Sequence, residues 1–144
     1  MSGRSPQELA EAVAARLRDR DPASGHIGLA LVSVGPGTAT IAMTVEPHLA
    51  NGLNVCHGGY IFTLADTAMA YASNASNRPA LAQAAHVTFL APGLVGDRLT
   101  AVATETAQAG RNGVYDVEVR NQDGKQIAVF RGQTRTVQGE ILTE

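Results

Sequence analysis

Residues 57–77 read HGGYIFTLADTAMAYASNASN, and this stretch decides the fold. Its small and apolar residues recur at the spacing of one helical face: Ile61, Ala65, Ala68 and Ala72. The other faces are also mostly apolar, with no Lys or Arg and a single acid, Asp66. A helix that is apolar nearly all round is a buried helix. The stretch therefore predicts a buried central helix, and its many alanines allow close approach by a sheet or a second helix.

Segments with strand character flank this helix on both sides. Before it, residues 27–34 form an apolar run and residues 38–46 alternate strictly, and Gly35-Pro36-Gly37 between them predicts a hairpin turn. After it come four strand-like runs separated by Gly, Pro and Asp turn signals: 80–90, 99–108, 114–120 and 126–137. The order predicts an α+β fold, in which an antiparallel sheet of five to six strands wraps around one long helix.

The start of the chain predicts a further helix that ends near Asp21-Pro22. Ser5 is a suitable cap, Pro6 suits the first turn, and Glu8 stands where a capping box requires an acid. No linker or repeat divides the chain. We therefore expect a single domain, residues 1–144, in which residues 1–22 form an N-terminal helical extension.

Composition excludes several classes of function. The net charge is −2, so no basic field would attract nucleic acid or an anionic membrane. No apolar run approaches the roughly 20 residues of a membrane span, and the N-terminus lacks a signal core. A single cysteine and histidines without metal-ligand spacing indicate neither a disulfide framework nor a metal site. We expect a cytoplasmic protein without metal or cofactor.

Asp66 is the first candidate for function. It lies about eight residues inside the predicted helix, too deep to act as an N-cap. A carboxylate in such a place needs a partner, a solvated cleft or a catalytic role. A structural hydrogen bond across a subunit contact, to a hydroxyl such as that of Thr63 or Thr67, is an equally open alternative.

His57-Gly58-Gly59 opens the same helix and offers a site for negative charge. Glycines weaken a helix, but they leave backbone N–H donors unobstructed at its positive end. An anion or a developing oxyanion fits there, although a tight turn alone would also use two glycines. A donor, a carboxylate and an apolar surrounding together indicate acyl transfer.

The spacing of these residues predicts the assembly. Gly58 and Asp66 are eight residues apart, about 12 Å along a helix, so one chain does not bring both to one carbonyl. Two antiparallel copies of the helix would place Gly58 of one beside Asp66 of the other. We therefore expect a homodimer with shared active sites.

A further set of motifs surrounds these residues. They are Asn51-Gly52, Cys56-His57-Gly58-Gly59, residues 62–68 (FTLADTA), Phe89-Leu90 with Pro92-Gly93, Gly96-Asp97, residues 113–116 (GVYD) and Phe130-Arg131-Gly132. Over residues 40–137 the sequence resembles the hot-dog-fold thioesterases of the PaaI type, from phenylacetate degradation. The block from His57 to Asp66 is the most specific part of this resemblance.

The resemblance implies an acyl-CoA thioesterase that assembles as a dimer of dimers and acts on phenylacetyl-CoA-like, ring-hydroxylated substrates. Coenzyme A would be part of the substrate. Asp66 would be the nucleophile or the general base, and the Gly58 or Gly59 N–H would polarise the thioester carbonyl. The remaining residues implied to assist are Asn51, His57 and Thr67.

Several of these residues also have structural explanations. Asn51 suits an Asn-Gly turn, and His57 could cap the helix. Cys56 lacks the spacing of a Cys–His dyad. Arg111 could meet a CoA phosphate or be a solvated turn residue.

Two other functions stay open from the sequence. A non-catalytic acyl-CoA-binding or sensing module would use the same groove. A hot-dog dehydratase would need a His and acid arrangement that this sequence does not offer.

Overall fold

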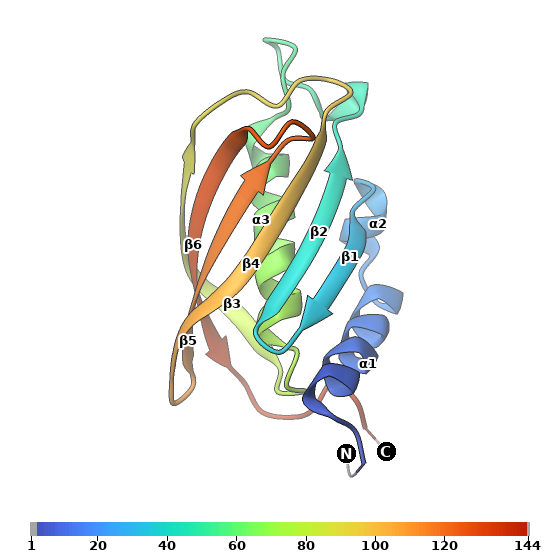
Figure 1. Cartoon of the computed structure of the whole chain (residues 1–144), viewed down its shortest axis with the longest axis vertical. Helices are drawn as coiled ribbons and strands as arrows, with labels where there is room; N and C mark the ends of the chain where they lie inside the picture. Colours follow the sequence, from blue (N-terminus) through green and yellow to red (C-terminus); the bar gives the residue numbers. More distant parts are fainter. Residues whose placement is uncertain (1–2, 144) are drawn as a thin grey trace.

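The computed structural model describes residues 3–143, in which one long helix, α3 (Gly58–Ser73), runs along the concave side of a curved sheet (Figure 1). Before α3 the elements are α1 (Pro6–Asp19), α2 (Pro22–His26), β1 (Ala30–Gly35), β2 (Thr38–Thr44) and the short 3-10 helix η1 (Pro47–Leu49). After α3 they are β3 (Ala80–Phe89), β4 (Arg98–Ala109), β5 (Asn112–Arg120) and β6 (Gln126–Thr136). The predicted order of strands and helices is confirmed.

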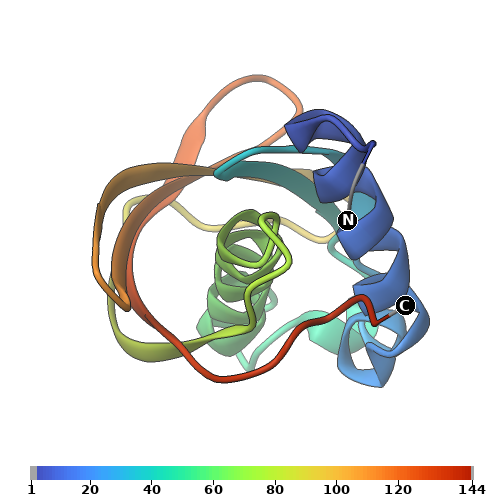
Figure 2. The same cartoon turned by 90° about the horizontal axis from the view of Figure 1, so that it is seen from below.

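The sheet has six strands in the order β1-β2-β4-β5-β6-β3, and every neighbouring pair is antiparallel. Figure 2 shows the sheet curving around α3, so that the helix occupies the hollow of the sheet. This is the expected hot-dog arrangement. Its two edge strands are β1 and β3, and α1 packs beside β1.

The core forms between α3 and the inner face of the sheet. Inner residues of the second strand and the residue after it are at most 1% exposed: Ala39, Ile41, Met43 and Val45. Leu64, Ala65 and Ala68 of α3 are fully buried. Helix and sheet pack closely at Gly132, where an added Cβ would overlap the Sδ atom of Met69. The inward face predicted for residues 38–46 is therefore confirmed, but Ala42 on the opposite face is also buried. The small residues permit the close packing.

Three predicted boundaries need correction. The N-terminal helix ends at Asp19, because Asp21 caps a second short helix whose first residue is Pro22. The first strand begins at Ala30 rather than at residue 27, because the chain turns through Gly28, which has a φ of +74°. The central helix ends at Ser73 rather than at residue 77, because the Asn74 side chain bonds both Ala70 O and the backbone of Ala80.

Within the single chain, the predicted burial of the central helix is confirmed on one face. The sheet covers only one face of α3. The opposite face stays partly exposed along its length, at Phe62, Thr63, Asp66, Thr67 and Ala70. Asp66 lies on this open face, so its carboxylate is not enclosed by its own subunit.

Candidate active site

The N-terminus of α3 is held by His57. This residue is the N-cap, and its Nδ1 accepts the Gly59 N–H at 2.9 Å. A ring nitrogen that accepts is unprotonated, so in this assigned tautomer Nε2 carries the hydrogen and remains a donor. The capping role considered for His57 is confirmed. Since Gly59 is engaged by the cap, Gly58 is the glycine whose N–H has no acceptor among residues 3–143.

A groove of about 420 Å³ opens directly at this helix start. It is lined by Gly58 and Ile61 of α3, by Asn51 and Cys56 of the preceding loop, and by residues 89–93. The two loops are fastened together, because the Cys56 N–H donates to Gly93 O at 2.7 Å. The lining is mainly apolar, with Asn51 and the free Gly58 N–H as polar groups. Such a surface suits an acyl group whose carbonyl meets a donor.

Asn51 shapes the loop as well as lining the groove. Its Oδ1 accepts the N–H groups of Leu53 at 2.9 Å and Val55 at 3.3 Å. These bonds confirm the turn role considered for Asn51. They use only the carbonyl end of the amide, so the side-chain NH₂ has no acceptor within residues 3–143 and remains available as a donor.

Asp66 has no hydrogen-bond donor among residues 3–143. The hydroxyls of its own face are engaged elsewhere, since Thr63 Oγ1 donates to Gly59 O at 2.9 Å and Thr67 Oγ1 donates to Thr63 O at 2.7 Å. The alternative of a hydrogen bond across a subunit contact concerns a second chain and stays a prediction. Burial raises the pKa of the Asp66 carboxyl above its ordinary value. An unpartnered acid with a raised pKa is a candidate base or nucleophile.

The structure does not bring all the predicted residues together in one chain. Asn51 and Gly58 share the groove at the start of α3, but Asp66 does not line it. Thr67 lines a different, smaller cavity between α2 and α3. The separation agrees with the eight-residue spacing, about 12 Å along the helix.

Arg111 lies far from the groove of its own chain. It stands in the turn after β4, a strand of 12 residues whose other end follows the groove loop. At about 3.4 Å per residue, that strand spans roughly 40 Å. A contact of Arg111 with CoA would therefore have to involve a site on another subunit.

Cys56 is not a reactive group in this fold. Burial raises the pKa of the Cys56 thiol to about 11, so it is protonated and a poor nucleophile. Among residues 3–143 no three His, Cys, Asp or Glu side chains gather as metal ligands. No helix of the described chain is long and apolar enough to cross a membrane.

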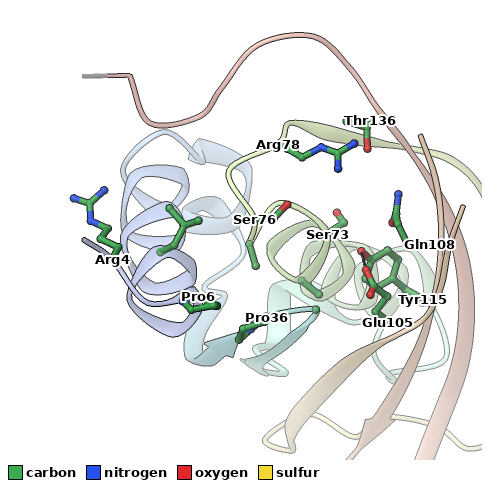
Figure 3. Close-up of a pocket in the computed structure, with 14 residues that line it drawn as sticks. Arg4, Pro6, Pro36, Ser73, Ser76, Arg78, Glu105, Gln108, Tyr115 and Thr136 are labelled. Carbon is green, nitrogen blue, oxygen red and sulfur yellow. Dashed lines mark hydrogen bonds between the residues drawn. The ribbon is translucent and has the colours of Figure 1, made fainter. Parts of the chain in front are cut away.

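A further cavity, larger than the groove, had no counterpart among the sequence expectations. About 540 Å³ in volume, it lies at the other end of α3, beside the β1–β2 turn and the ends of β4 and β6 (Figure 3). Figure 3 shows Tyr115 and Glu105 together on its wall, and the Tyr115 hydroxyl donates to Glu105 at 2.8 Å. None of the predicted site residues lines this cavity.

Comparison with known proteins finds one family over most of the chain. A family model described as the thioesterase superfamily matches residues 53–128, which include Asp66 and most of the groove. The acyl-coenzyme A thioesterase PaaI of Escherichia coli strain K12 is 42% identical over 126 residues, covering 88% of this chain and 90% of that protein.

Comparison with solved structures gives the same result. The structure of Escherichia coli PaaI, from the phenylacetic acid degradation operon, superposes with a TM-score of 0.93 at 40% identity, covering 94% of this chain and 99% of that one. A variant of the phenylacetic acid degradation protein PaaI from Thermus thermophilus gives a TM-score of 0.78 at 33% identity, covering 81% and 100%.

Proposed function

We propose that this chain, which belongs to the thioesterase superfamily and is a thioester hydrolase, acts on the CoA thioester of an aryl-acetic acid and releases the free acid and CoA. Support for the acyl-CoA substrate comes from the 42% identity to acyl-coenzyme A thioesterase PaaI. Support for the aryl-acetyl group comes from the similarity to a protein of a phenylacetic acid degradation operon. A phenylacetyl or ring-hydroxylated phenylacetyl group is the proposed acyl group.

Asp66 is the proposed catalytic carboxylate, as general base or nucleophile. The observation that carries this proposal is that its carboxylate accepts no hydrogen bond from residues 3–143. A carboxylate that accepts no hydrogen bond within residues 3–143, on a partly buried helix face, contributes nothing to folding. Its raised pKa brings it closer to the operating pH, which improves a general base. In that role Asp66 would take a proton from the attacking water; as a nucleophile it would form an acyl-aspartyl anhydride that water then opens.

The Gly58 N–H is the proposed donor to the thioester carbonyl. It stands at the positive end of α3 and at the groove, whereas the Gly59 N–H is engaged by His57. Negative charge that develops on the carbonyl oxygen would be stabilised there, and the thiolate of CoA would leave. The Asn51 amide and the His57 Nε2–H are the proposed groups that position substrate or water. No cofactor takes part in this scheme.

The proposed catalytic unit is a homodimer with two shared sites. Asp66 does not line the groove of its own chain, so a second α3 has to supply the acid. Two surfaces support such pairing. The free edge of β3 offers unpaired backbone groups, and its Leu81 and Phe89 are 65% and 50% exposed. The open face of α3 offers Phe62 and Ala70 for a partner helix. A dimer of dimers remains part of the proposal.

Replacing Asp66 by Asn tests the assignment. The amide keeps the shape of the side chain but is neither base nor nucleophile, so kcat should fall by roughly 10²- to 10⁴-fold with binding of the CoA ester nearly unchanged. Thiol release from phenylacetyl-CoA measures kcat, and isothermal calorimetry measures binding.

The matched control is Asp123→Asn in the exposed β5–β6 turn, which should keep full activity. An Asp66→Asn enzyme that still turns over at near the wild-type rate would refute the role of Asp66. Heavy oxygen from labelled water appearing in Asp66 after a single turnover would identify the anhydride route.

A further inference from the structure

One wall of the groove at the start of α3 is the aromatic ring of Phe89. Phe89 is the last residue of β3, and it pairs in register with Ala128 of β6. Cross-strand partners point to the same side of a sheet, and Ala128 is fully buried on the concave side. Phe89 therefore faces α3, and its half-exposed ring borders the groove.

The backbone that carries this ring is fixed at both ends of the groove wall. The chain after Phe89 still bonds β6, because the N–H groups of Leu90 and Ala91 donate to Ile127 O at 2.8 and 3.2 Å. The loop that follows is tied to the residue before the helix cap by the bond from the Cys56 N–H to Gly93 O. The sheet and these bonds therefore set the position of the ring.

The edge of the ring lies against Gly58. A Cβ built on Gly58 would lie 3.1 Å from Phe89 Cζ, and 3.4 and 3.5 Å from the two Cε atoms of the same ring. Because carbon atoms pack at about 3.5–4.0 Å, no further atom fits between Gly58 and the ring. Phe89 thus closes the groove on one side of the Gly58 N–H.

The same contact places the ring beside the proposed position of the thioester carbonyl. A Cβ is about 2.5 Å from its own backbone nitrogen, so Phe89 Cζ lies no more than about 5.6 Å from Gly58 N. A carbonyl oxygen that accepts the Gly58 N–H lies about 2.9 Å from this nitrogen, and its carbon is about 1.2 Å further on. The first carbon of the acyl group would then pack against the ring, and a substituent on that carbon would meet it.

The rest of the groove wall offers little space for such a substituent. Cys56 and Ile61, which also line the groove, are only 4% and 3% exposed. A Cβ at Gly93 would lie 3.2 Å from Cys56 Cβ, so the two loops are in close contact as well. Closely packed walls do not accept an added methyl group without a cost in free energy.

We propose that Phe89 is a specificity-determining residue, which excludes acyl groups that carry a branch on the carbon next to the carbonyl. An unbranched acyl group presents only hydrogen atoms there and passes the edge of the ring. This inference rests on the proposed function and restricts its substrates by the shape of the acyl group beside the reacting carbonyl.

The experiment compares kcat/KM for phenylacetyl-CoA with kcat/KM for each enantiomer of 2-phenylpropionyl-CoA, which adds one methyl group at the carbon in question. Each value is divided by the rate constant for alkaline hydrolysis of the same ester, so that the intrinsic effect of the branch is removed. The wild-type enzyme should prefer phenylacetyl-CoA by roughly 10- to 100-fold.

Phe89→Leu removes the edge of the ring but keeps an apolar wall, so the preference should fall by at least about fivefold. The ring borders the carbon on one side only. The gain in kcat/KM should therefore fall mainly on one enantiomer, a result that a general loosening of the fold would not produce.

Leu81→Ala is the matched control, because Leu81 is an exposed apolar residue of the same edge strand but does not line the groove. It should leave the preference unchanged. The proposal is overturned if the wild-type enzyme hydrolyses all three esters equally well, if Phe89→Leu retains the preference, or if Leu81→Ala lowers it equally. A wild-type enzyme that does not hydrolyse phenylacetyl-CoA would refute the proposed function, and this inference with it.

Discussion

Two inactive variants should restore each other's activity if the active site is shared between subunits. Gly58 and Asp66 are fixed on one helix about 12 Å apart, and Asp66 does not line the groove that contains Gly58. In a two-fold dimer each site would take Gly58 from one subunit and Asp66 from the other. In a mixed dimer, with Asp66 replaced in one subunit and Gly58 replaced in the other, both substitutions therefore fall in the same site.

Asp66→Asn removes the acid, and Gly58→Val fills the groove, because a Cβ at position 58 would already lie 3.1 Å from Phe89 Cζ. Each variant alone has both sites damaged. In a heterodimer one site carries both lesions and the other carries none. Random exchange of an equimolar mixture makes about half of the dimers mixed, each with one intact site, so about a quarter of the wild-type activity should return.

The assay is thiol release from phenylacetyl-CoA after unfolding and refolding the two variants together, with native mass spectrometry to measure the fraction of mixed dimers. A mixture of Asp66→Asn with Asp66→Ala is the control and should regain nothing, because every site lacks the acid. Mixed dimers that form in the expected proportion without any gain in activity would refute the shared site and place both residues in one chain.

Two further predictions concern stability. Asp66→Asn should raise the melting temperature at neutral pH, because the raised pKa means that the folded protein binds this proton more tightly than the unfolded chain does. The stability that protonation of Asp66 provides is full in acidic buffer and is lost as the pH rises through the folded pKa. Thermal melts should therefore show a higher melting temperature for Asp66→Asn than for the wild type only in neutral buffer. An equal difference in acidic buffer would contradict this. Gly132→Ala should cost roughly 1–3 kcal/mol in urea unfolding, because its Cβ would overlap Met69 Sδ and lie 2.8 Å from Phe130 Cε1. Gly25→Ala, which faces open space within α2, should not lower stability, and a similar loss in both variants would exclude the packing explanation.

The fold was largely predictable because its periodicities are simple. The alternation in residues 38–46 reports directly which side chains face the core, and β2 follows it. The capping box at Ser5 and Glu8 is a local interaction, so it was predicted correctly. The ends of α1 and α3 were missed because they depend on side chains, Asp21 and Asn74, that bond backbone beyond the helix itself.

The candidate site was only partly predictable, because some of its features depend on sequence spacing and others on contacts that form only in the fold. Gly58, His57 and Asp66 fall in one contiguous stretch, where spacing alone fixes their separation. The smaller cavity between α2 and α3 brings together Asp21 and Tyr71, which are 50 residues apart, through a contact that no local pattern predicts. The hydrogen bond from the Gly59 N–H to His57 Nδ1 likewise could not be predicted, because the two glycines are equivalent in the sequence.

The two faces of α3 show why Asp66 is better explained by chemistry than by folding. On the sheet face, small and apolar residues are buried completely, and each contributes to the core. On the open face, a desolvated acid without a donor in the described part of its own chain lowers the stability of the folded state when it ionises. An apolar residue at position 66 would avoid that cost and would pair equally well with a partner helix. The acid therefore weakens the folded subunit, and this cost is the physical argument for the proposed role of Asp66 as general base or nucleophile.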